Sequence, residues 1–168
     1  STYGDLVVTR YTRDGAYITT TYVDGFPATG TLGGASTGPR RGITEPGDVV
    51  GEYASATADA TGRVHVAYYD RTNGALKYAV NTEGPIWVTM VVDDADDAGR
   101  YASIAIRPSD GVPVISYTVL GINGVGRTLS RVKVAEATTA NPRQTTDWTV
   151  RLVEEAPGFD ACNGACTA

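Results

Sequence analysis

An internal repeat constrains the fold of this chain more than any other feature of its sequence. Four blocks occur twice in the same order, roughly fifty to sixty residues apart. The pairs are GEYAS and GRYAS (51–55 and 99–103), GRVHVAYYD and GVPVISYTV (62–70 and 111–119), ALKYAV and RVKVAE (75–80 and 131–136), and WVTMVVDD and WTVRLVEE (87–94 and 148–155). Repetition at this period is typical of solenoids, propellers and arrays, in which neighbouring copies stack. We therefore expect stacked copies of one structural unit.

Each block has the pattern of a short β-strand. From residue 64 on, for example, Val, Val and Tyr alternate with His, Ala and Tyr, which is the period of two found in strands. The pair Asn73-Gly74, between the second and third blocks, is a residue choice typical of a tight hairpin with positive φ. Four such strands joined by turns predict an antiparallel meander of the size of one propeller blade.

The repeat predicts about two and a half blades. The expected units are the second half of a blade (1–25), a Gly-, Pro- and Thr-rich inter-blade loop (26–50), a full blade (51–98), a full blade with enlarged loops (99–157) and a Cys-containing segment (158–168). The half blade is assigned because GDLVVTRY takes the place of GALKYAV, and AYITTTYVDG takes the place of IWVTMVVDD. Propellers use roughly four to eight blades, so we expect partner blades from a longer parent chain or from other copies.

The blocks resemble the repeats of secreted bacterial β-propeller-like proteins. The consensus of those repeats runs roughly G-Y-x-S-I-A-x-D, G-x-P-H-I-S-Y-Y-D, N-G-x-L-K-Y-A, W and V-D, and this chain has GEYAS, VHVAYYD and NGALKYA in the same order. The resemblance covers about Glu45 to Glu155 well and Gly4 to Gly25 loosely. It implies four-stranded antiparallel blades and an extracellular or cell-surface location, and it supplies no catalytic set.

Composition agrees with an all-β protein. Gly is abundant (20 residues) while Met (1) and Phe (2) are scarce, which favours turns and strands over helices. The net charge of -5 argues against a general attraction to nucleic-acid phosphates or anionic membrane surfaces. No stretch approaches the roughly eighteen continuous apolar residues that a membrane span needs. We therefore expect neither a nucleic-acid partner nor a membrane span.

The inter-blade loop and one repeat tyrosine supply the candidate ligand contacts. Segment 26–50 has no periodicity, and loops of this length are often functional or mobile. Its charge pair, Arg40 and Arg41, suits contact with an anion. Tyrosines such as Tyr69 can line a channel or a blade-to-blade seam, because the ring is buried while the hydroxyl keeps a polar partner. We name Arg40, Arg41 and Tyr69 as candidate binding residues, with a plain surface loop as the alternative for 26–50.

Four aspartates form the densest cluster of oxygen ligands in the sequence: Asp93, Asp94, Asp96 and Asp97. Calcium takes six to eight oxygen ligands, so four carboxylates in a turn between blades could seed a site. Their spacing does not match an EF-hand loop. A solvated turn is the favoured interpretation and a calcium site is the alternative; no other cofactor is expected.

No catalytic constellation stands out. His65 is the only histidine, no nucleophile elbow lies near it, and we interpret it as a strand residue on the second face of a blade. Trp87 and Trp148 occupy equivalent positions in the two repeats, which indicates packing on the outer strands, with sugar stacking as the alternative. Glycosidase chemistry needs two carboxylates across a sugar bond, and the sequence offers no distinctive pair.

Both cysteines, Cys162 and Cys166, lie in the C-terminal segment. Two ligands cannot complete a structural zinc site, which needs four. We expect a disulfide between them; free thiols, pairing to partners beyond the chain and a metal site are the alternatives. A disulfide would agree with an extracellular or cell-surface location.

These features favour a non-catalytic extracellular or cell-surface propeller module that binds another macromolecule, protein or glycan, or builds an assembly. A glycan-acting hydrolase or a lectin on a propeller scaffold is the alternative. The hydrolase predicts that loss of one acid, such as Asp70, abolishes turnover without unfolding. The lectin predicts sugar binding that depends on Tyr or Trp residues at equivalent positions of the repeats.

Overall fold

The computed structural model describes residues 4–27, 30, 32–33, 40–82, 86–122 and 128–157. Within these ranges the chain forms ten β-strands and one short 3-10 turn at Thr145–Asp147. All paired strands are antiparallel, which confirms the expected all-β class. The strands are β1 (Leu6–Tyr11), β2 (Tyr17–Asp24), β3 (Val50–Ala58), β4 (Val64–Asp70), β5 (Ala75–Asn81), β6 (Trp87–Asp93), β7 (Asp97–Ile106), β8 (Pro113–Ile122), β9 (Thr128–Ala137) and β10 (Trp148–Pro157).

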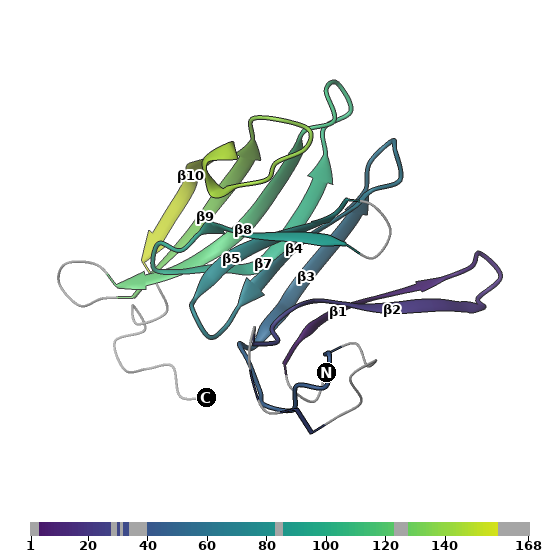
Figure 1. Cartoon of the computed structure of the whole chain (residues 1–168). Helices are drawn as coiled ribbons and strands as arrows, with labels where there is room; N and C mark the ends of the chain where they lie inside the picture. Colours follow the sequence, from purple (N-terminus) through teal and green to yellow (C-terminus); the bar gives the residue numbers. More distant parts are fainter. Residues whose placement is uncertain are drawn as a thin grey trace.

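The strands make two four-stranded sheets and one hairpin (Figure 1). We call the β3-β4-β5-β6 meander sheet 1 and the β7-β8-β9-β10 meander sheet 2, while β1 and β2 pair only with each other. The four-stranded antiparallel unit expected from the repeat is therefore present twice. The described sheets do not close into a ring. In the same part of the chain, no helix has the length and apolar character needed to cross a membrane.

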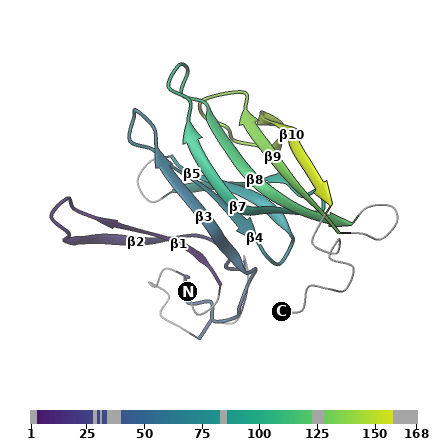
Figure 2. The same ribbon diagram turned by 180° about the vertical axis from the view of Figure 1, so that it is seen from behind.

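Sheet 1 is packed on both faces. Val66 and Tyr68 of β4 belong to a core shared with the hairpin, whereas Ala67 between them belongs to a core shared with sheet 2. Such a strand, buried on both sides, needs apolar residues at successive positions. This explains the run VHVAYYD, in which every residue after the first is buried. The hairpin extends away from the stacked sheets in two opposite views (Figures 1 and 2).

Aromatic residues fill the seam between the sheets. Tyr78 and Tyr117 are fully buried there, and the ring of Trp148 lies 4.9 Å from that of Tyr78, centroid to centroid. Trp87 is partly buried against the core next to the hairpin. The two tryptophans therefore pack in equivalent places, as the repeat predicts.

A bare glycine lets each sheet approach its neighbour. A Cβ on Gly99 of β7 would lie 2.8 Å from the Cα of Leu76 in β5, and one on Gly51 of β3 would lie 3.1 Å from the Cδ1 of Leu6 in β1. Both glycines have positive φ, 111° and 88° respectively. The glycine that opens the GEYAS and GRYAS blocks is thus required by close packing and by backbone conformation.

Two seams run through the molecule, one between the hairpin and sheet 1 and one between sheets 1 and 2. Each contains a polar cluster, which we call the inter-sheet clamp. In the first clamp, Tyr68 donates its hydroxyl to Asp24 at 2.7 Å, and the ammonium group of Lys77 pairs with the same carboxylate. Asp24 is the last residue of β2 in the hairpin, whereas its two partners come from β4 and β5 of sheet 1. The clamp therefore joins the end of one repeat to the middle of the next.

The second clamp reproduces the first in the next seam. Tyr117 donates to the Oδ2 of Asp93 at 2.6 Å, and the Nζ of Lys133 lies 2.9 Å from the same oxygen. Burial alone would raise the pKa of the Asp93 carboxyl, but the hydrogen bonds from Tyr117 and Lys133 outweigh it and hold that pKa below its usual value. Asp93 is therefore an ionised group whose charge is balanced within the seam.

Candidate functional site

Two exposed tyrosines at equivalent repeat positions form the centre of the candidate site. Tyr53 and Tyr101 are the third residues of GEYAS and GRYAS, and both have left-handed backbone conformations, with φ of 51° and 54°. The strand register shifts on both sides of Glu52 and on both sides of Arg100, so each tyrosine lies in a bulged stretch of the first strand of its sheet. Bulges reorient side chains, and here they do so identically in both sheets.

The bulges bring the two rings together at the surface. Tyr53 is 37% exposed and Tyr101 is 68% exposed, and their ring centroids lie 4.6 Å apart with an interplanar angle of 51°. The two residues belong to different sheets, β3 and β7, so the pair bridges the seam from outside. Left-handed backbone costs a non-glycine residue about 1–2 kcal/mol, and such strain often occurs at functional sites.

The buried Tyr69 and the half-buried Arg100 and Asp97 support this pair. The ring of Tyr69 lies 6.0 Å from that of Tyr53, and the guanidinium carbon of Arg100 lies 4.9 Å from the Tyr69 ring centroid. Asp97 binds both supporting residues, accepting the Tyr69 hydroxyl and the Arg100 guanidinium, the latter at 2.9 Å. We call Tyr53, Tyr69, Tyr101 and Arg100 the tyrosine platform.

The charges beneath the two exposed rings are mutually neutralised. Burial and the neighbouring Asp97 carboxylate raise the pKa of Tyr69 to about 12, so this tyrosine stays protonated as a hydrogen-bond donor. Burial alone would lower the pKa of Arg100, but the hydrogen bond to Asp97 and the charge of that carboxylate outweigh it and raise this pKa. These partners fix the supporting side chains, which leaves the two exposed rings above a rigid base. Tyr69, expected as a ligand contact, lies in this base and is itself buried.

The two loop arginines have separate roles. Arg40 is buried, with its Nε 2.8 Å from the Oδ2 of Asp5, and it donates to the carbonyls of Ile43 and Glu45 at 2.9 and 3.0 Å. Its guanidinium therefore anchors the loop to the start of the hairpin. Arg41 is exposed and has a φ of 53°.

The aspartate cluster is dispersed among different basic partners. Asp93 lies in the second clamp, Asp97 binds Arg100, and Asp96 pairs with Arg131 at 2.5 Å, while Asp94 is exposed. In the ranges that the structure describes, no group of three or more His, Cys, Asp or Glu residues could hold a metal ion. The geometry thus gives the calcium alternative no support. Cys162 and Cys166, expected to form a disulfide, lie outside the described residues.

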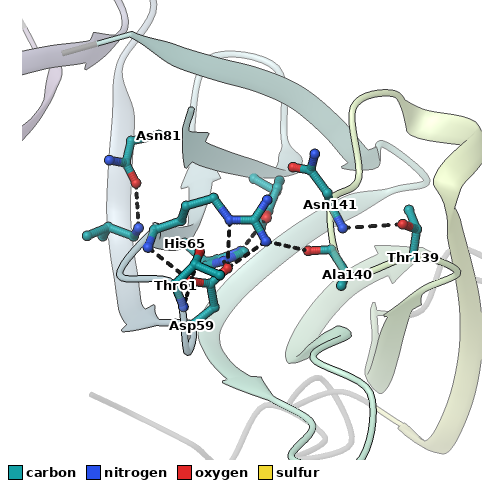
Figure 3. Close-up of polar contacts among 10 residues, drawn as sticks. Asp59, Thr61, His65, Asn81, Thr139, Ala140 and Asn141 are labelled. Atoms are coloured by element: carbon teal, nitrogen blue, oxygen red, sulfur yellow. Dashed lines mark hydrogen bonds and ion pairs between the residues drawn. The ribbon is translucent and has the colours of Figure 1, made fainter. Parts of the chain in front are cut away.

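His65 lies inside the protein. Its side chain is fully buried, with Nδ1 at 2.5 Å from the Tyr78 hydroxyl. Its Nε2 lies 3.3 Å from the Oδ2 of Asp59 (Figure 3). Asp59 also accepts the backbone N–H of Thr61 at 2.9 Å and the Nε–H of Arg63 at 2.7 Å. The histidine is therefore a structural link between β4, β5 and the turn that precedes β4, in agreement with its interpretation as a strand residue.

Acidification below neutral pH should destabilise the fold through His65. Burial lowers the pKa of this histidine, although the Asp59 carboxylate partly opposes the change. In the unfolded chain the ring takes up a proton at its ordinary value near 6.5, so below that pH the unfolded state binds more protons and stability decreases. We expect the free energy of unfolding, from urea titrations at pH 7.5 and pH 5.5, to decrease by at most about 1.4 kcal/mol per pH unit.

His65→Gln, which keeps a hydrogen-bonding group beside Tyr78, should flatten this pH dependence. The chain has one histidine, so the comparison isolates its titration. An equal slope in the variant and the wild type would contradict the assignment.

The platform has the chemistry of a binding surface, because aromatic faces and a fixed guanidinium layer offer contact area with little entropy loss. Sequence patterns pointed to Tyr69 and missed Tyr53 and Tyr101 as exposed partners, although their shared place in the G-x-Y-A-S block was a usable signal. No family model, curated protein or solved structure matches this chain.

Proposed function

We propose that this chain is a non-catalytic, extracellular or cell-surface module of propeller-like blades that binds another macromolecule through the tyrosine platform. The observation that carries the proposal is the pair Tyr53 and Tyr101, two exposed rings in tilted contact at equivalent repeat positions. Backbone strain at one bulge could be an accident of packing. The same strained backbone at the equivalent tyrosine of both repeats supports a functional reason for the position of the two rings.

Tyrosine suits this role physically. It buries a large, rigid surface while fixing only two side-chain torsions, and it is enriched among residues that dominate binding energy at interfaces. The platform spans two sheets, so a ligand bound there would contact both repeats at once. Stacking further blades would extend the row of tyrosines by one residue per blade.

Partner blades remain part of this proposal. In sheet 1 the face that carries Leu76 and Val92 is buried against sheet 2, whereas the equivalent Val132 and Val153 of sheet 2 are exposed. Glu154 pairs with Val132 as Asp93 pairs with Leu76, which places it at the position of a third clamp.

The next blade would meet a polar surface on that face of sheet 2. Glu136 and Arg151 stand there at the repeat positions that Val80 and Met90 occupy in sheet 1. They form an ion pair of 3.6 Å. A partner blade would therefore need polar groups opposite them, in addition to a tyrosine and a lysine for Glu154.

The hydrolase alternative finds less support around its suggested acid. Asp70 is buried and accepts the backbone N–H of Asn73 at 3.0 Å and its side-chain amide at 2.9 Å. Gly74 in the same turn has a φ of 64°, as the Asn-Gly pair predicts. The carboxylate of Asp70 thus stabilises the turn between β4 and β5.

Binding should depend on the platform rather than on exposed tyrosines in general. We would screen the intact chain against a printed panel of neutral oligosaccharides and purified extracellular proteins, and measure the affinity of Tyr101→Ala for each panel member that binds the wild type. We expect Tyr101→Ala to weaken binding about tenfold, the usual effect of losing an aromatic contact. Tyr11→Ala is the matched control, because Tyr11 is 59% exposed but lies on the distant hairpin. An empty panel together with glycan hydrolysis by the chain would contradict the proposal.

A further inference from the structure

A groove of about 320 Å³ lies between the hairpin and sheet 1. Strands β1 and β2 form one wall, and the start of β4, the end of β5 and the start of β6 form the other. The lining residues are Val8, Arg10, Thr19, Thr21, Gly62, Val64, Asn81 and Trp87. None of them belongs to the tyrosine platform, so the groove is a separate feature of the molecule.

The repeat shows what occupies the same place in the other seam. Leu6 pairs with Asp24 as Leu76 pairs with Asp93, so Val8 of β1 is the counterpart of Tyr78 in β5. In the seam between the sheets, the Tyr78 ring packs at 4.9 Å from that of Trp148. Trp148 corresponds to Trp87, which lines the groove. The hairpin has Val8 where sheet 1 has the Tyr78 ring, so the groove beside Trp87 corresponds to the space that a six-membered ring fills in the other seam.

The wall opposite Trp87 is polar where the other seam is apolar. By the same register, Arg10 stands at the position of Val80, Thr21 at that of Met90 and Thr19 at that of Val88. Three replacements of an apolar residue by a polar one line a single groove. The ring that fits there consequently needs polar substituents on the side facing β1 and β2.

The charge of the groove is positive. Arg10 is the only charged residue among the eight that line it, and the contacts within the described part of the chain include no ion pair for its guanidinium. The whole chain has a net charge of -5, so a groove lined by one arginine and by no acidic residue is a local exception. A guanidinium of this kind suits a carboxylate, which it can bind with two hydrogen bonds.

We propose that the groove binds a sugar ring that carries a carboxylate. The apolar face of the ring would stack on Trp87, the carboxylate would pair with Arg10, and the threonine hydroxyls would bind the ring hydroxyls. This site goes beyond the proposed platform function and does not depend on it.

Calorimetric titration of the intact chain with trigalacturonate and with 3'-sialyllactose tests the inference. We expect one of the two probes to bind, and its carboxyl methyl ester to bind about tenfold more weakly, as expected on loss of one charge-assisted contact. No heat from either probe, or equal binding of acid and ester, would overturn the proposal.

Two variants locate the binding. Val8→Tyr restores the residue found at the equivalent position in the other seam, so it should fill the groove and abolish binding while the protein stays folded. Arg10→Gln should weaken binding about tenfold. Arg13→Gln, a change in the hairpin turn outside the groove, is the matched control. Undiminished binding by folded Val8→Tyr would place the sugar elsewhere, and Tyr101→Ala should leave acid-sugar binding intact whether or not the platform proposal holds.

Discussion

Gly99→Ala should lower the free energy of unfolding by about 3 kcal/mol or more. The new Cβ would lie 2.8 Å from the Cα and 3.0 Å from the backbone nitrogen of Leu76, neither of which can move without shifting β5. The residue also has a φ of 111°, where any L side chain is strained. Overpacking and backbone strain each cost about 1–3 kcal/mol, and here both act at once. Urea unfolding followed by far-UV circular dichroism would measure the loss.

Gly62→Ala separates the two causes. Gly62 also has a positive φ, 84°, but nothing lies within 4 Å of the place where its Cβ would be. Strain alone should cost this variant about 1 kcal/mol. Equal stability of Gly99→Ala and Gly62→Ala would contradict the claim that the close contact between β7 and β5 requires a glycine in the GRYAS block.

Lys133→Met should destabilise the protein by about 3 kcal/mol. The side chain of Lys133 is 14% exposed and that of Asp93 is 7% exposed, so the substitution would leave a buried carboxylate with Tyr117 as its main partner. Removing one member of a buried ion pair typically costs about 3–5 kcal/mol, because the remaining charge is uncompensated. Thermal and urea unfolding at pH 7 would both report the change.

The control for this variant is a surface ion pair. Arg71 is 67% exposed and lies 3.3 Å from Glu52, so Arg71→Met should cost less than about 1 kcal/mol. Lowering the pH to 4 should reduce the difference in free energy of unfolding between Lys133→Met and the wild type. The reason is that a protonated Asp93 no longer leaves an uncompensated charge in the core of the variant. A gap that does not change with pH would mean that Lys133 acts through packing alone.

The repeat made much of the fold accessible from the sequence. The order of the strands, the two meanders, and the packing of Trp148 on an outer strand follow from alternating apolar residues in ordered blocks, although the strands extend beyond those blocks. Such patterns report local backbone geometry and which face of a strand is buried. A repeat also predicts that residues at equivalent positions make equivalent contacts, and both clamps and both close-packed glycines do so.

The candidate site was less accessible because it depends on departures from regular alternation. A strand pattern places Tyr53 and Tyr101 on a simple period of two, and only the bulges reveal that the rings meet across the seam. The clustered aspartates suggested a shared cation, yet Asp96 pairs with Arg131, 35 residues away, through folding that no local spacing reports.

The most direct test of the platform is to identify a panel ligand that binds the wild-type chain and to measure the affinity of four proteins for that ligand by surface plasmon resonance. These are the wild type, Tyr53→Ala, Tyr101→Ala and the Tyr11→Ala control. We expect both platform variants to bind about tenfold more weakly and the control to bind like the wild type. Unchanged affinity in both folded platform variants would contradict the claim that the repeated tyrosines form the binding surface.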